Sequence, residues 1–209
     1  MLFWLSSPEG TCVLRPICLG FRKPLHALLL SAAFLTALLP LTLHAQAAED
    51  VLSQKEVDTL RDTAFVPTDR IAAFGQFLTD RQKHIADLIA KRHGHTDYGG
   101  DMHDAIDQFG QIVDELNDNL DEYSRAHRDV RKALPKLLKV VDEWTATLNS
   151  AAPNDAYNVV RKIALDNLKD TREITGQLQT DLDAYFKAHP EALKEEKKRN
   201  SNPHAVRPE

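Results

Sequence analysis

Residues 102–134 have the sequence MHDAIDQFGQIVDELNDNLDEYSRAHRDVRKAL. Apolar and aromatic side chains recur there at alternating steps of four and three residues, with His127 as the strongly polar member of the series. The series consists of Met102, Ile106, Phe109, Val113, Leu116, Leu120, Tyr123, His127, Val130 and Leu134. Such a heptad repeat is typical of a helix that packs one side against neighbouring helices.

Helical patterns continue on both sides of this series. Before it, Ser53 and Glu56 form a capping box that predicts a short helix, and Pro67 separates that helix from a longer one. After it, the apolar spacing crosses Pro135, where we expect a kink, and a last helix is predicted over residues 153–188. The predicted fold is all-α: an elongated antiparallel bundle of three long helical arms, or four to five helices when the two proline breaks are counted.

The N-terminal part of the chain resembles an export signal. Arg22 and Lys23 precede an apolar run over residues 25–43, and the run ends at the small-x-small motif Ala45-Gln46-Ala47. We therefore predict that residues 1–47 are an N-terminal extension plus a cleaved signal, and that the protein is exported to the periplasm or secreted. In the alternative, residues 25–43 are retained as an inner-membrane anchor, because about 20 apolar residues are enough to span a bilayer.

The remaining sequence divides into a helical bundle domain, residues 48–189, and a flexible charged tail, residues 190–209. Cleavage after residue 47 leaves 162 of the 209 residues, a length that suits one domain. It removes Cys12 and Cys18, so disulfides and cysteine-based chemistry are excluded from the mature protein. It also removes one acid and three bases, which changes the net charge from −5 to −7. An acidic chain has no long-range attraction to nucleic acid.

Sequence motifs of the common enzyme classes are missing. The chain has no Gly-x-Ser-x-Gly elbow, no Gly-x-x-x-x-Gly-Lys phosphate loop and no His-Glu-x-x-His zinc motif. We therefore expect a non-enzymatic bundle that acts in protein interaction or as a scaffold. Its partner is an unidentified protein or a second copy of the chain.

The loop after residue 93 is a candidate metal site. His93, His95 and His103 lie near the predicted hairpin tip together with several aspartates, and imidazole and carboxylate groups bind divalent transition metals. The simpler interpretation is a solvated polar loop. A metal-binding or metal-sensing protein in the periplasm or outside the cell is the alternative function. If the second and third arms form one antiparallel hairpin, this tip projects beyond the last helix, and Ile89 and Phe109 become a partner surface.

His127 interrupts the apolar series. Antiparallel pairing of the arms would bring it close to Asp69 and Thr171, and such a polar core layer would fix the register of the helices. A pH-sensitive switch and a ligand pocket are the two other interpretations of this histidine.

Overall fold

The computed structural model describes residues 51–94 and 96–201, and every regular element in these ranges is helical. The elements are α1 (Gln54–Asp62), α2 (Pro67–Ala90), the 3₁₀ turn η1 (Arg92–Gly94), α3 (Tyr98–Arg125), α4 (Leu134–Ser150), α5 (Asn158–Ala188) and α6 (Pro190–Ser201). The prediction of an all-α fold is confirmed. The described residues belong to a unit that spans residues 46–209. The predicted export signal lies outside them.

None of the helices in the described ranges combines the length and the apolar character needed to cross a bilayer.

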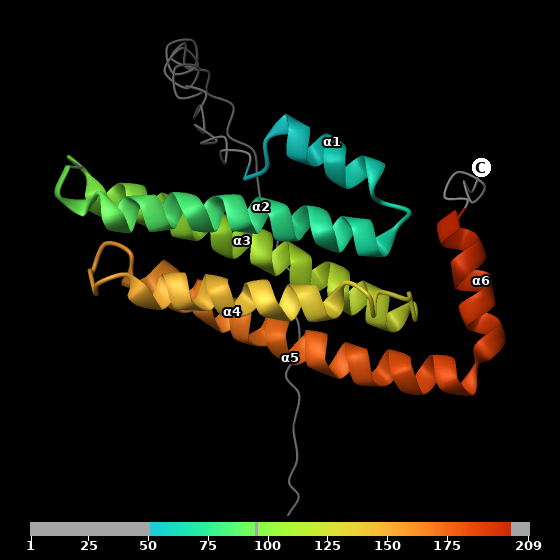
Figure 1. Ribbon diagram of the computed structural model, residues 1–209. Helices are drawn as coiled ribbons and strands as arrows, with labels where there is room; N and C mark the ends of the chain where they lie inside the picture. Colours follow the sequence, from blue (N-terminus) through green and yellow to red (C-terminus); the bar gives the residue numbers. More distant parts are fainter. Residues whose placement is uncertain (1–50, 95, 202–209) are drawn as a thin grey trace, which may run out of the picture. The chain divides into compact units, whose positions relative to one another are not determined.

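Four long helices surround the core. Helix α2 packs against α3 and α4, and α5 packs against the same two helices, so the order around the core is α2, α3, α5, α4 (Figure 1). The pair α2/α4 and the pair α3/α5 therefore lie on opposite sides of the core. The short helix α1 packs on α2, and α6 follows directly on α5.

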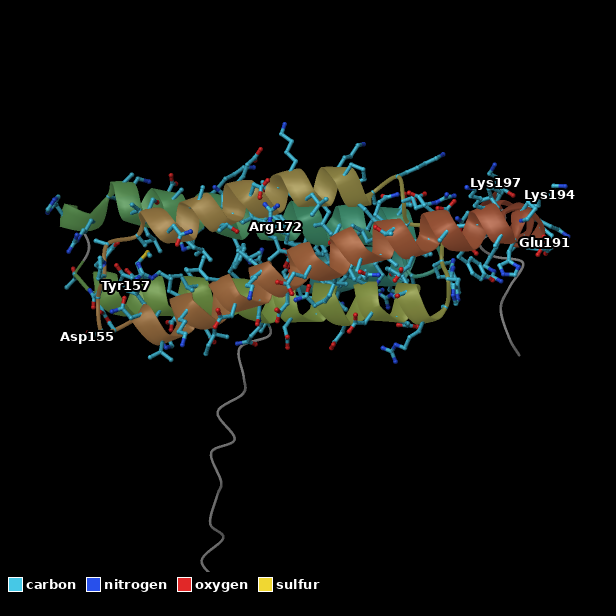
Figure 2. All side chains as sticks on the ribbon, turned by 90° about the horizontal axis from the view of Figure 1, so that it is seen from below. Asp155, Tyr157, Arg172, Glu191, Lys194 and Lys197 are labelled. Atoms are coloured by element: carbon cyan, nitrogen blue, oxygen red, sulfur yellow. The ribbon has the colours of Figure 1, made fainter. Side chains whose placement is uncertain are left out.

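The cross-helix contacts define the direction of each helix. Arg70 of α2 donates from Nε to Asn119 Oδ1 of α3 at 2.8 Å, which places the start of α2 beside the end of α3 and makes this pair antiparallel. Arg172 of α5 forms an ion pair with Asp142 of α4, and Arg131, just before α4, pairs with Asp183 near the end of α5, so this pair is antiparallel as well. Figure 2 shows Arg172 midway along α5, with Tyr157 near its start and α6 beyond its end.

The other two pairs of neighbours are parallel. On α2 and α4, the partner numbers rise together: Thr79 accepts a hydrogen bond from Trp144 Nε1 at 3.4 Å, and Gln82 donates to Thr147 at 2.7 Å. At the start of α3 and α5, the ring of Tyr98 lies 6.1 Å from that of Tyr157. Farther along both helices, Gly110 faces Ala164, so the residue numbers again rise together. The fold therefore consists of two helical hairpins, α2–α3 and α4–α5, that lie side by side in the same direction.

The chain reverses between α3 and α4, where the sequence predicts a kinked but continuous arm. Helix α3 ends at Arg125, and His127 adopts the left-handed conformation with φ of 49°. Pro135 lies in the first turn of α4, where its missing N–H is not needed, so it begins a helix instead of bending one. The apolar spacing survives the reversal because Val130 and Leu134, on the turn and at the start of α4, are both fully buried.

The two ends of the described chain are held by ion pairs. Ser53 and Glu56 form the predicted capping box, and Arg81 of α2 donates two hydrogen bonds to the Glu56 carboxylate, which lowers the pKa of that group. At the other end, Glu196 of α6 is buried and accepts from Arg128 Nε at 2.7 Å. Residues 190–201, predicted as part of a flexible tail, are therefore a docked helix. Residues 202–209 lie outside the described ranges.

Candidate functional site

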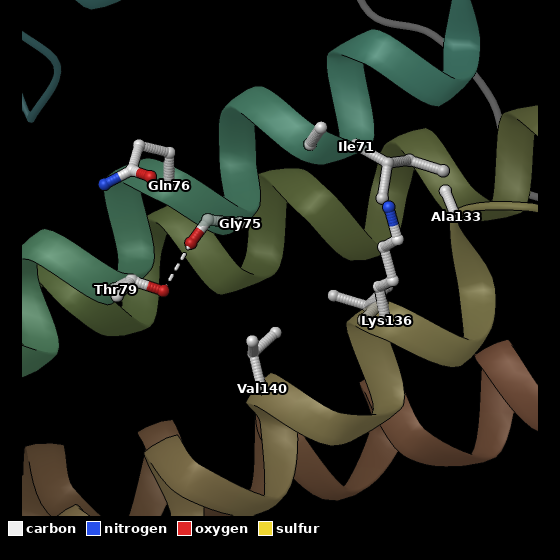
Figure 3. Close-up of a pocket in the computed structure, with 9 residues that line it drawn as sticks. Ile71, Gly75, Gln76, Thr79, Ala133, Lys136 and Val140 are labelled. Atoms are coloured by element: carbon white, nitrogen blue, oxygen red, sulfur yellow. Dashed lines mark hydrogen bonds between the residues drawn. The ribbon is translucent and has the colours of Figure 1, made fainter.

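An apolar groove runs along the surface between the parallel helices α2 and α4 (Figure 3). Its volume is about 250 Å³. The buried side chains of Ile71 and Leu137 lie at its base. The remaining lining residues are Ala72, Gly75, Gln76, Thr79, Ala133, Lys136 and Val140. This volume is below the roughly 300–1,000 Å³ of most small-molecule pockets, so the groove suits protein side chains better than an enclosed cofactor.

Small side chains on α2 create the groove. Gly75 and Thr79 occupy successive turns, and Figure 3 shows Val140 of α4 pointing toward this strip. At Thr79 the space is filled by Trp144, whose indole N–H donates to the threonine hydroxyl. At Gly75 a Cβ atom would meet no described atom within 4 Å other than those of its chain neighbours and its own helix backbone. The groove is therefore open to a side chain from outside at the level of Gly75.

The opposite side of the core carries exposed aliphatic side chains. Val159 and Ile163 lie one turn apart on α5 and are 69% and 52% exposed. They are the most exposed of the large hydrophobic residues in the described ranges. Beside Ile163, between α3 and α5, a depression of about 140 Å³ is lined by Asp107 and Asp114 among others. This face is thus an apolar ridge with an acidic border.

No family model, curated protein or solved structure matches the chain. Any assignment of function therefore depends on the surfaces and cavities of the chain itself.

The structure describes two of the three predicted metal ligands, His93 and His103. His93 is exposed on η1, and His103 on α3 lies 3.1 Å from the neighbouring carboxylate of Asp104. Within residues 51–94 and 96–201, no three histidine, cysteine or acidic side chains are placed to share a metal ion. His95 lies outside the described ranges, so the three-histidine arrangement remains a prediction.

The predicted partner surface at the hairpin tip is not formed by Phe109. This side chain is fully buried, and its ring meets that of Trp144 edge-on at 5.9 Å. Ile89 is half-buried against the core. The reason is the reversal after α3: the parallel α5 and the separate α4 cover the tip that a continuous arm would have left exposed.

The predicted polar core layer is also absent from the structure. His127 and Asp69 are exposed, and only Thr171 is buried. The histidine ring stacks on Tyr185 with 3.9 Å between centroids, and the Thr171 hydroxyl donates to the Asn167 carbonyl of its own helix at 2.8 Å. The reversal moves His127 out of the heptad series and onto the surface turn.

The sequence patterns missed the groove for a related reason. A groove between α2 and α4 requires that these helices be neighbours, and apolar periodicity does not show which helices are neighbours. Two signals were present in the sequence. Gly75 interrupts an otherwise favourable helix, and Val159 and Ile163 form an i, i+4 apolar pair outside the buried stripe of α5.

Proposed function

We propose that this chain is a non-enzymatic scaffold protein that self-associates, with the α2/α4 groove of one copy receiving the Val159/Ile163 ridge of another. The open space above Gly75 is the observation that carries the proposal. The ridge supplies what such a groove needs, two aliphatic side chains one helical turn apart.

Charge supports the same pairing. Of the described residues that line the groove, Lys136 alone is charged, whereas the depression beside the ridge is lined by Asp107 and Asp114. Lys162 lies next to Ile163 on the ridge and weakens this complementarity without removing it. Opposite charges around an apolar contact favour one orientation and penalise others.

The two surfaces lie on opposite sides of the core, so their contact is head-to-tail. A heterologous contact of this kind builds open chains or rings, because each added copy presents a free groove and a free ridge. Val159 and Ile163 are already partly covered, so burying the rest of both side chains contributes about 2–3 kcal/mol, which is small against the cost of association. We therefore expect weak, concentration-dependent assembly, which an exported scaffold uses where it accumulates.

The proposal also includes the cellular location of the protein. We place the protein in the periplasm or outside the cell after signal cleavage, with retention by residues 25–43 as the alternative. A divalent transition metal at His93, His95 and His103 remains the alternative function from the sequence. None of the described contacts favours the metal-binding function over the scaffold.

Filling the groove is expected to abolish self-association without harming the fold. Gly75→Leu places a side chain in open space, and leucine is about 0.8 kcal/mol better than glycine inside a helix, so thermal stability should be unchanged or raised. Sedimentation velocity over a concentration series should show assembly for the original protein and monomers for this variant.

Gly176→Leu is the matched control. Gly176 also lies inside a helix and also has no atom near the position of a Cβ, but it is exposed on α5 away from the groove. This variant should gain helix stability and still assemble. Equal loss of assembly in both variants, or a monomeric original protein at every concentration, would show that the groove does not mediate self-association.

A further inference from the structure

A second cavity, more polar than the groove, lies where the α1–α2 connection, the start of α2 and the end of α3 meet. Its volume is about 260 Å³, several times that of a water molecule. The lining residues are Ala64, Arg70, Asn119, Glu122, Tyr123, Ala126 and Arg128. Two guanidinium groups and a phenol thus border one space.

The Tyr123 hydroxyl is the first sign that this space takes a ligand. The residue is 6% exposed, and its Oη atom is buried with no hydrogen-bond partner among the described residues. A buried hydroxyl without a partner is costly, so such groups are rare in folded proteins. Burial raises the pKa of Tyr123, which keeps the phenol protonated and able to donate at neutral pH.

Arg70 supplies a positive charge without a matching acid. Its Nε donates to Asn119 Oδ1 at 2.8 Å and its Nη1 donates to the Leu60 carbonyl at 2.7 Å. Both acceptors are neutral. Within the described ranges no carboxylate forms an ion pair with Arg70, its Cζ lies 5.6 Å from the centroid of the Phe74 ring, and its Nη2 makes no hydrogen bond. The neutral acceptors hold the guanidinium in place, and part of its donor capacity remains unused.

Arg128 adds a second guanidinium group to the lining of the cavity. Its Nε pairs with Glu196 and its Nη2 donates to the Phe65 carbonyl at 3.3 Å, while Nη1 makes no hydrogen bond to the described residues. Glu122 is the acid among the lining residues, and it is exposed. Because Glu196 compensates the charge of Arg128, Arg70 is the cation of this lining that has no ion-pair partner among the described residues.

We propose that this cavity binds a small oxyanion, a phosphate or the carboxylate of a small organic acid, through the Tyr123 hydroxyl and the Arg70 guanidinium. Both ligand groups accept hydrogen bonds from a phenol and a guanidinium, and charge-assisted bonds of this kind are stronger than neutral ones. The ligand would give Tyr123 the acceptor that the described chain does not provide. This site is separate from the α2/α4 groove and does not depend on self-association.

Isothermal titration calorimetry with inorganic phosphate and with succinate, at constant ionic strength in chloride, tests the site. We expect saturable binding of one ion per chain. Tyr123→Phe should weaken binding by roughly tenfold or more, because it removes one hydrogen bond to a charged ligand. Without the anion this variant should melt at the same temperature as the original protein or higher, since the lost hydroxyl had no partner. Glu122→Gln should strengthen binding.

Tyr185→Phe is the matched control, because Tyr185 lies outside the cavity and its hydroxyl makes no hydrogen bond to the described residues. It should leave the affinity unchanged. Arg70→Gln should abolish binding, and the phenylalanine variant at position 123 keeps the test decisive if loss of Arg70 disturbs folding. Binding of phosphate alone or of succinate alone supports the site and identifies the ligand class. No saturable binding of either probe, or equal affinity in Tyr123→Phe, would overturn the proposal and leave a water-filled cavity.

Discussion

Phe109→Ala is expected to lower the free energy of unfolding by about 3–5 kcal/mol. The Phe109 side chain is fully buried on α3, and its ring packs edge-on against Trp144 of α4. Removing the ring loses its burial, leaves a cavity, and deletes an aromatic contact between helices from the two hairpins. Because the neighbouring helices are long and held at many points, they cannot collapse to fill the space.

Chemical denaturation, followed by circular dichroism, measures this loss. Ile89→Ala serves as the comparison, because Ile89 is only half-buried and should cost about 1 kcal/mol. If the two variants lose similar amounts of stability, Phe109 lies at an exposed tip and the packing of α3 against α4 is wrong.

Gly110→Leu is expected to destabilise the protein by about 1–3 kcal/mol, and Gly110→Ala to be neutral or stabilising. Gly110 is buried on α3 where that helix passes α5, and a Cβ added there would lie 3.6 Å from the Cβ of Ala164. That distance is ordinary van der Waals contact, so alanine fits and also favours the helix. The longer leucine side chain either presses on Ala164 and moves α3 and α5 apart, or enters the adjacent depression in a forced rotamer.

The test compares the melting temperatures of the two Gly110 variants with that of Gly75→Leu. The same change from glycine to leucine should lower the melting temperature at position 110 and leave it unchanged or raised at position 75. Both glycines lie inside long helices, so helix propensity alone would change the two melting temperatures in the same direction. Opposite changes are expected only because the two positions have different neighbours. A stable Gly110→Leu protein would contradict the parallel contact of α3 with α5.

Apolar periodicity predicted the secondary structure well. The all-α fold, the capping box at Ser53 and the end of the last long helix at Ala188 are confirmed. These features depend on neighbours within a few residues, and such local interactions are recorded directly in the spacing of the side chains.

The connection between α3 and α4 could not be predicted in the same way. Val130 and Leu134 keep the heptad spacing while the chain turns back, so the series itself gives no sign of the reversal. Pro135 is compatible with a kink and with a helix start, and only the packing of α4 beside α2 distinguishes them. The partner surface at Phe109 and the polar core layer at His127 both assumed a continuous arm, and for that reason these two predictions were wrong.

The candidate sites depend on contacts that are remote in sequence. The groove combines residues about 65 positions apart on α2 and α4, and the polar cavity combines Arg70 with Tyr123 and Arg128. Single residues in these sets look ordinary in the sequence. An arginine without an ion-pair partner, or a glycine with free space beside it, indicates a candidate site only when its neighbours in the fold are known.

Mixing two assembly-deficient variants tests the scaffold proposal most directly. Gly75→Leu closes the groove and keeps the ridge, whereas a variant with both Val159→Asp and Ile163→Asp keeps the groove and loses the ridge. Each should be monomeric alone. An equimolar mixture should form dimers and nothing larger, as measured by sedimentation velocity, because one functional groove meets one functional ridge. A mixture that stays monomeric, while the original protein assembles, would contradict head-to-tail association through these two surfaces.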